Sequence, residues 1–253
     1  MGVRQQFKAE ERRNAVYVNN FTKQLQRLRR DMMNVVIANM SGSVETLAQN
    51  AASWVNESYL PSFYNQMYIG VGGYWARKQY NSLLGLKQDI RDAVWEQQLK
   101  LWVEANTGER IISVQGTLKE WVQNTVQRYV DIALENGTGI ELITQRVKDF
   151  LNFEFVGYQE WKVRQIVANE VLTAYSVSNK IGADSTGLDY TKTWIWSGSK
   201  DPHHNHIPLN GKTIGKDELF TVGQYTAKYP RDLTLGPEES IGCKCAIAYR
   251  PKR

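Results

Sequence analysis

Apolar side chains recur every three or four residues through most of the chain up to about residue 181. This spacing places apolar positions on one face of a helix and predicts a succession of amphipathic helices. The helices are expected at residues 4–39, 86–105, 117–135, 138–150 and 161–182. Helix ends are expected at Asn106-Thr107-Gly108, Asn136-Gly137 and Gly182, because glycine adopts the left-handed conformation of a helix C-cap without a steric penalty.

The segment between residues 58 and 80 is helical in pattern but carries Pro61 and a cluster of glycines from Gly70 to Gly73. Glycine in a helix marks either a break or a close approach of another backbone, so we expect one of the two here. The aromatic stripes of this segment and its neighbours are typical of the buried core of a helical bundle.

After Gly182 the pattern changes. Alternation of polar and apolar residues over 191–196 predicts a strand, and short strands are expected near 212–214 and 246–249, with a turn at Asn210-Gly211 between them. The predicted fold is mainly α, with an elongated multi-helix N-terminal body and a small α+β C-terminal module. The expected divisions are a basic helical arm (1–60), a helical body (61–184) and the module (185–253).

Composition supports a folded core but adds an uneven charge. The 253 residues are 42% hydrophobic and carry a net charge of +5. Eight cations in the first 30 residues are opposed only by Glu10 and Glu11; they are Arg4, Lys8, Arg12, Arg13, Lys23, Arg27, Arg29 and Arg30. Such a face can contact nucleic acid or an acidic protein, or it can be a solvated helix surface.

The hydropathy of the chain also bears on its location. It contains no run approaching the roughly 20 apolar residues of a membrane helix, and its start lacks the apolar core of a signal peptide. We therefore expect a protein that stays in the cytoplasm of the cell that makes it and does not contact a membrane.

All histidines and cysteines of the chain lie near its C-terminus, at His203, His204, His206, Cys243 and Cys245. Imidazole and thiolate are the ligands that structural zinc prefers, and two distant pairs of ligands are its usual arrangement. His203 and His206 with Cys243 and Cys245 would form an N2S2 tetrahedron suited to zinc. The alternative is a set of buried or hydrogen-bonded side chains without a metal.

The order of motifs in the C-terminal region resembles a known family. The sequence runs through NEVLTAYSVSNKIGA, WIWSGSKD, a histidine before IPLNGK, GPE and finally GCKC. This order is similar to the head morphogenesis domain of tailed bacteriophages, the family of minor head proteins similar to protein F of phage Mu. The resemblance covers about residues 160–250, and the positions that match its motif are Glu170, Trp194, His206, Asn210, Gly211, Cys243 and Cys245.

The chain also departs from that family. His203, His204 and Asn205 stand where members often have arginines, and Asn169 stands where they often have threonine. The resemblance therefore does not define the role of the additional histidines.

The resemblance implies a minor structural protein of the phage head, not an enzyme. Such a protein would associate with the portal vertex or inner capsid during head assembly in the bacterial cytoplasm and remain in the virion. Its implied partners are the portal protein, major capsid or scaffolding proteins, and DNA whose packaging or delivery it assists.

Two other functions fit parts of the sequence. A DNA-binding virion protein would use the basic arm, and its binding would weaken steeply with salt. A metal-dependent nuclease would use the histidine cluster with Asp201 or Asp217. The consecutive His203-His204-Asn205-His206 sequence disfavours the nuclease, because nucleases with an HNH motif place these residues on separate elements.

Overall fold

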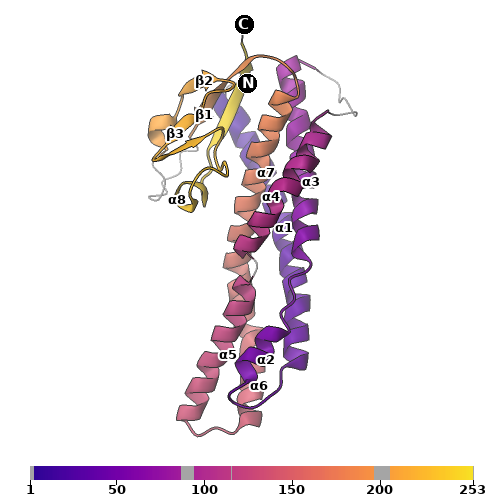
Figure 1. Cartoon of the computed structure of the whole chain (residues 1–253), viewed down its shortest axis with the longest axis vertical. Helices are drawn as coiled ribbons and strands as arrows, with labels where there is room; N and C mark the ends of the chain where they lie inside the picture. The colour runs from indigo at the N-terminus through magenta and orange to yellow at the C-terminus, as the bar shows by residue number, and fades with distance from the viewer. Residues whose placement is uncertain (1–2, 87–93, 115, 197–205, 253) are drawn as a thin grey trace. The chain divides into compact units, whose positions relative to one another are not determined.

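A computed structural model describes residues 3–86, 94–114, 116–196 and 206–252, which are mainly α-helical with a small antiparallel β module near the C-terminus, as predicted (Figure 1). The helices are α1 (Val3–Asn39), α2 (Leu47–Ser53), α3 (Leu60–Leu84), α4 (Val94–Val114), α5 (Thr117–Glu135), α6 (Ile140–Tyr158) and α7 (Arg164–Asp184), with a π-helical turn (Gln159–Val163) before α7. None of the described helices is both long enough and apolar enough to cross a membrane.

The chain forms two compact units, each built from separate segments. Unit 1 contains residues 1–20, 65–105 and 165–253, and unit 2 contains residues 21–64 and 106–164. The boundaries near residues 60 and 185 that the sequence suggests remain predictions.

Unit 2 buries one apolar cluster formed by the amphipathic faces of its helices. Leu118, Val122, Val126 and Val130 of α5 supply one side of it, at the spacing that the sequence shows. The helix ends where predicted, because Gly137 takes the left-handed conformation with φ of 65°.

In unit 1, Gly72 of α3 and Gly182 of α7 mark close helix contacts rather than helix ends. A Cβ on Gly72 would lie 2.6 Å from Ser178 Oγ and 2.7 Å from a Leu99 methyl group, and a Cβ on Gly182 would overlap the backbone of Ala76. The expected break near Gly70 to Gly73 is wrong, and the alternative of a tight contact is confirmed. Helix α7 continues past Gly182 to Asp184, and the missing side chain at Gly182 permits the close approach to Ala76.

Two other predicted helix ends are also wrong. Helix α4 runs through Asn106-Thr107-Gly108 to Val114, since one glycine costs a helix only about 1 kcal/mol. Helix α6 passes Phe150 and is followed directly by the π-helical turn. Trp161, the first residue of the helix expected over 161–182, lies in this turn and has an exposed fraction of 66%.

The C-terminal module contains the predicted strands. Strand β1 (Tyr190–Ile195) lies between β2 (Thr213–Gly215) and β5 (Ala246–Pro251) in an antiparallel sheet (Figure 1). Lys192 of β1 pairs with Ile214 on one side and with Tyr249 on the other. A hairpin of β3 (Phe220–Val222) and β4 (Tyr225–Ala227) and the short helix α8 (Pro237–Ser240) complete the module.

Candidate metal centre

Strand β1 supplies the wall of the candidate site. Its alternating pattern buries Tyr190, Lys192 and Trp194 on the same face. The Trp194 indole meets the ring of Phe220 edge-on at 5.1 Å and the ring of His206 edge-on at 5.7 Å between centroids. Trp194 therefore packs against one side of His206.

The Asn210-Gly211 turn holds the His206 segment against β1. Gly211 has φ of 81°, and the Lys212 amide donates to the Leu209 carbonyl at 2.9 Å, which closes the turn. The Gly211 amide donates to the Trp194 carbonyl at 2.8 Å, and the Trp196 amide donates to Asn210 Oδ1 at 3.0 Å. The predicted turn is confirmed, and its asparagine side chain adds a contact to the residue after β1.

The two cysteines approach His206 from the other side of the module. Cys243 follows Gly242, which has φ of 80°, and Cys245 immediately precedes β5. His206 Nδ1 lies 3.5 Å from Cys243 Sγ and 3.6 Å from Cys245 Sγ, and all three residues are buried. We call these three residues the His–Cys cluster; their ligand atoms lie within 4.8 Å of one another, so the cluster could hold a metal ion.

The spacing of these atoms fits zinc. Bond lengths of about 2.05 Å to nitrogen and 2.3 Å to sulfur at a tetrahedral angle separate the two ligand atoms by about 3.6 Å. The nitrogen–sulfur distances of the His–Cys cluster, 3.5 and 3.6 Å, agree with this value. The donors therefore suit a borderline-soft divalent ion better than magnesium or calcium, which prefer oxygen ligands.

Glu239, at the end of α8, orients His206. Its Oε2 lies 2.8 Å from His206 Nε2, the ring nitrogen opposite the sulfurs. A proton on Nε2 donated to the carboxylate leaves the Nδ1 lone pair directed at the cysteines, as in many metal-bound histidines. Glu239 was not among the residues predicted for this site, although an acidic residue shortly before the two cysteines is a usable signal in the sequence.

Arg231 also lies at the site and was not predicted from the sequence. Its side chain is buried, and its guanidinium donates to the Cys243 carbonyl, to the Cys245 carbonyl at 3.1 Å and to Ser176 Oγ of α7 at 2.6 Å. Arg231 also has φ of 63°, a left-handed conformation that is unfavourable for a residue with a side chain. Nothing in the sequence distinguishes this arginine from surface arginines.

The protons of the cluster are unevenly shared. A hydrogen bond from the Cys245 thiol, with further help from His206 and Arg231, holds the pKa of Cys243 well below its ordinary value despite burial. The same sulfur–sulfur contact, together with burial, raises the pKa of Cys245. Burial alone would lower the pKa of His206, but Cys243 and Glu239 outweigh it and raise this pKa. The cysteine pair therefore offers a thiolate to a metal more readily than an isolated buried thiol would.

The successive contacts Cys243–His206 and His206–Glu239 also have the arrangement of a nucleophile, a base and an orienting carboxylate. Catalysis would require a substrate to reach the sulfur, yet Cys243 and Cys245 are each only 3% exposed and His206 is 2% exposed. A metal bound by these three residues would not need a substrate to reach the sulfur, so the burial is compatible with metal binding.

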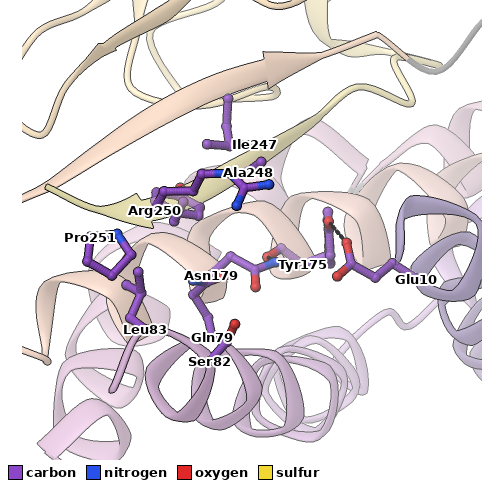
Figure 2. A pocket seen from close by; sticks show the side chains of 11 residues that line it. Glu10, Gln79, Ser82, Leu83, Tyr175, Asn179, Ile247, Ala248, Arg250 and Pro251 are labelled. Carbon is purple, nitrogen blue, oxygen red and sulfur yellow. Dashed lines mark hydrogen bonds between the residues drawn. The ribbon is translucent and has the colours of Figure 1, made fainter. Parts of the chain in front are cut away.

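A separate cavity of about 160 Å³ lies beside β5 and the face of α7 that carries Tyr175 and Asn179 (Figure 2). Glu10 lines one end, where it accepts a hydrogen bond from the Tyr175 hydroxyl at 2.6 Å and pairs with Lys78 at 3.0 Å. The residues that line this cavity do not include the His–Cys cluster. Its polar lining is thus distinct from the candidate metal centre.

Glu170, the remaining described residue of the motif, is not part of the His–Cys cluster. Glu170 is buried in α7 and accepts a hydrogen bond from the Tyr68 hydroxyl at 2.7 Å. His203, with His204, Asn205 and Asp201, lies outside the described residues. The fourth zinc ligand therefore remains a prediction.

The predicted basic face is only partly exposed. Lys8, Arg12, Arg13, Lys23, Arg27 and Arg30 are exposed on α1, whereas the side chain of Arg4 is outside the description. Arg29 is fully buried and pairs with Glu57 at 3.8 Å, so its prediction as a surface contact is wrong. The reason is its helical position, which faces the interior of unit 2 together with Leu25 and Met32.

Comparisons with known proteins give two partial likenesses. A segment of 120 residues, 46% of this chain, is 32% identical to the uncharacterized protein YqbB of Bacillus subtilis (strain 168) and covers 38% of that protein. A segment of 84 residues, 32% of this chain, is 30% identical to the NAD(+)–arginine ADP-ribosyltransferase EFV of Enterococcus faecalis (strain ATCC 700802 / V583) and covers 17% of it. No protein-family model and no solved structure matches the chain. Because the chain spans well under half the length of either relative, these likenesses do not define its family.

Proposed function

We propose that this protein is a minor structural component of a tailed-phage head, with a C-terminal module closed by zinc. The observation that carries the proposal is the convergence of six of the seven motif residues, all but Glu170. Trp194, His206, the Asn210-Gly211 turn and both cysteines are separated by up to about 50 residues in sequence, yet they surround one buried site. A motif whose spaced pieces form a single structural unit supports the phage-head resemblance more strongly than any one piece does.

Zinc is the proposed ion because of donor type, spacing and charge. Nitrogen and two sulfurs are the preferred donors of a structural zinc site, and the ligand spacing fits its bond lengths. A divalent ion also balances the charge of two thiolates, so these ligands and the ion together carry no net charge when the imidazole is neutral. His203 is the proposed fourth ligand, because its spacing from His206 places two imidazoles within one short segment.

We propose a structural rather than an enzymatic role. The cluster is buried, and zinc-bound thiolates in a closed site act as fixed ligands rather than as nucleophiles. The transferase activity in the name of the Enterococcus relative is not extended to this chain, since the matched segment is 17% of that protein.

Binding to the portal protein tests the proposed role in the head. The full chain, immobilised through its N-terminus, would be incubated with the purified portal protein of the same phage and, as a control, with a portal protein from an unrelated phage. We expect retention of the first and not of the second. Retention of neither portal protein nor of the major capsid and scaffolding proteins of that phage would contradict a role in the head.

DNA binding is a second candidate, favoured by the exposed cations Lys8, Arg12, Lys23, Arg27 and Arg30 on α1. Contacts between these side chains and phosphates would weaken by orders of magnitude between 50 and 200 mM salt. Binding of duplex DNA that is insensitive to salt, or that survives removal of residues 1–30, would refute this alternative.

A further inference from the structure

Arg231 contacts both sides of a junction between the His–Cys cluster and α7. Its guanidinium donates to the carbonyls of Cys243 and Cys245 on the module, and one of the same nitrogens, Nη2, also donates to Ser176 Oγ on α7. Ser176 precedes Arg231 by 55 residues, and Cys243 and Cys245 follow it by 12 and 14 residues. One side chain therefore joins the backbone of the two metal-ligand residues to a helix outside the metal site.

The geometry of the Cys243–Cys245 segment decides whether this junction can form. Both carbonyls must point at the same guanidinium while both sulfurs point at His206 Nδ1. A metal bound to both sulfurs would restrict the backbone between them, and the same restriction presents the two carbonyls to the planar fork of the arginine. Without that restraint the cysteine segment has more conformations, and few of them satisfy all three acceptors.

The strained backbone at Arg231 indicates that the contacts of this residue stabilise the fold by more than the strain costs. A left-handed conformation is unfavourable for a residue with a side chain and persists where surrounding contacts over-determine it. The neighbouring Asp232 supports the turn, because its carboxylate accepts from the Lys228 amide at 2.7 Å. The hydrogen bonds of the guanidinium supply the remaining restraint.

We propose that Arg231 is a positioning residue that couples metal occupancy of the His–Cys cluster to the docking of the C-terminal module on α7. The inference rests on the proposed metal site. It adds that metal binding also affects α7, a helix that supplies none of the ligands in the His–Cys cluster. Metal binding orders the cysteine carbonyls, the carbonyls hold the guanidinium, and the guanidinium holds Ser176. Without the metal, the carbonyls of Cys243 and Cys245 are less ordered and hold the Arg231 guanidinium less firmly. The module is then less firmly docked on α7.

Ser176 and Ser178 form a matched pair for the test. Both are buried serines of α7, but Ser176 accepts from Arg231, whereas Ser178 Oγ has no hydrogen-bond partner among the described residues. Hydrogen–deuterium exchange of the full chain would be followed with bound zinc and after chelation, in the parent protein, Ser176→Ala and Ser178→Ala. Metal content would be measured in each sample, so that metal binding and coupling are scored separately.

In the parent protein and in Ser178→Ala, we expect chelation to accelerate exchange in the α7 segment around residue 176 by about tenfold. Ser176→Ala should retain one zinc per chain, but its α7 segment should exchange at nearly the same rate with and without the metal. Arg231→Lys has a single ammonium in place of the fork, so the thiolate-to-metal absorption band of its cobalt form should shift, whereas the band of Ser176→Ala should not.

Three results would overturn the inference. Zinc that binds without any effect of chelation on α7 would refute the coupling and leave the metal site intact. Equal responses of Ser176→Ala and Ser178→Ala would remove Arg231 and Ser176 from the connection. Absence of bound zinc and of cobalt binding in the parent protein would refute both the metal site and the coupling.

Discussion

Replacement of Glu239 by glutamine should weaken metal binding without removing any metal ligand. The carboxylate lies 2.8 Å from His206 Nε2 and its side chain is 21% exposed, so the contact is shielded from water on most sides. Glutamine can still accept a hydrogen bond from Nε2, but it lacks the negative charge that makes the imidazole a stronger donor of electrons to a metal. Charge-assisted hydrogen bonds are about twice as strong as neutral ones, which corresponds here to a loss of about 1 to 1.5 kcal/mol.

This loss predicts a dissociation constant for zinc that is about tenfold higher in Glu239→Gln, within the range found when partners of metal-bound histidines are removed. Competition with a chromophoric chelator would measure the affinity. Glu238→Gln is the matched control, because Glu238 is adjacent in sequence but accepts from the Tyr225 hydroxyl at 2.6 Å instead of from His206. Equal affinities of the two variants would refute the assignment of Glu239 as the residue that orients His206.

Two further predictions concern stability. Burial lowers the pKa of Lys192 to about 8 from 10.5, so between these pH values the unfolded chain binds more protons and the stability of the folded protein rises with pH. The stability advantage of Lys192→Met over the parent, measured by urea denaturation, should therefore shrink by about 2 to 3 kcal/mol between pH 7 and pH 10. A constant difference would contradict the burial of this lysine. Gly182→Ala should lower the unfolding free energy by about 1 to 3 kcal/mol, because its Cβ would overlap the Ala76 backbone. The control Gly73→Ala has open space at its Cβ and should be neutral or stabilising by up to about 1 kcal/mol. Similar effects of both variants would exclude the close helix contact.

The sequence predicted the elements of the fold better than their contacts. Helical periodicity and strand alternation are local properties, and α5 and β1 lie where these patterns place them. Glycines were less informative, because Gly137 ends a helix while Gly182 permits a close approach within one. The two uses differ only in what packs against the residue, which local sequence does not contain.

The candidate site was predictable as far as its residue types are rare. His206, Cys243 and Cys245 could be predicted as site residues because the chain has few histidines and cysteines. The structure brings these three together. Glu239 and Arg231 belong to residue types that are usually exposed, so only the tertiary structure distinguishes them from the other acidic and basic residues. Arg29 shows the converse error, in which a charge in a basic run is buried against Glu57.

The most direct test of the account is the metal content of the purified full chain, measured by inductively coupled plasma mass spectrometry after removal of loosely bound ions. We predict about one zinc per chain in the parent protein and a loss of most of it in Cys243→Ser, because that variant lacks one of the cluster's two sulfurs. No zinc in the parent protein, or unchanged zinc in Cys243→Ser, would contradict a metal centre formed by His206, Cys243 and Cys245.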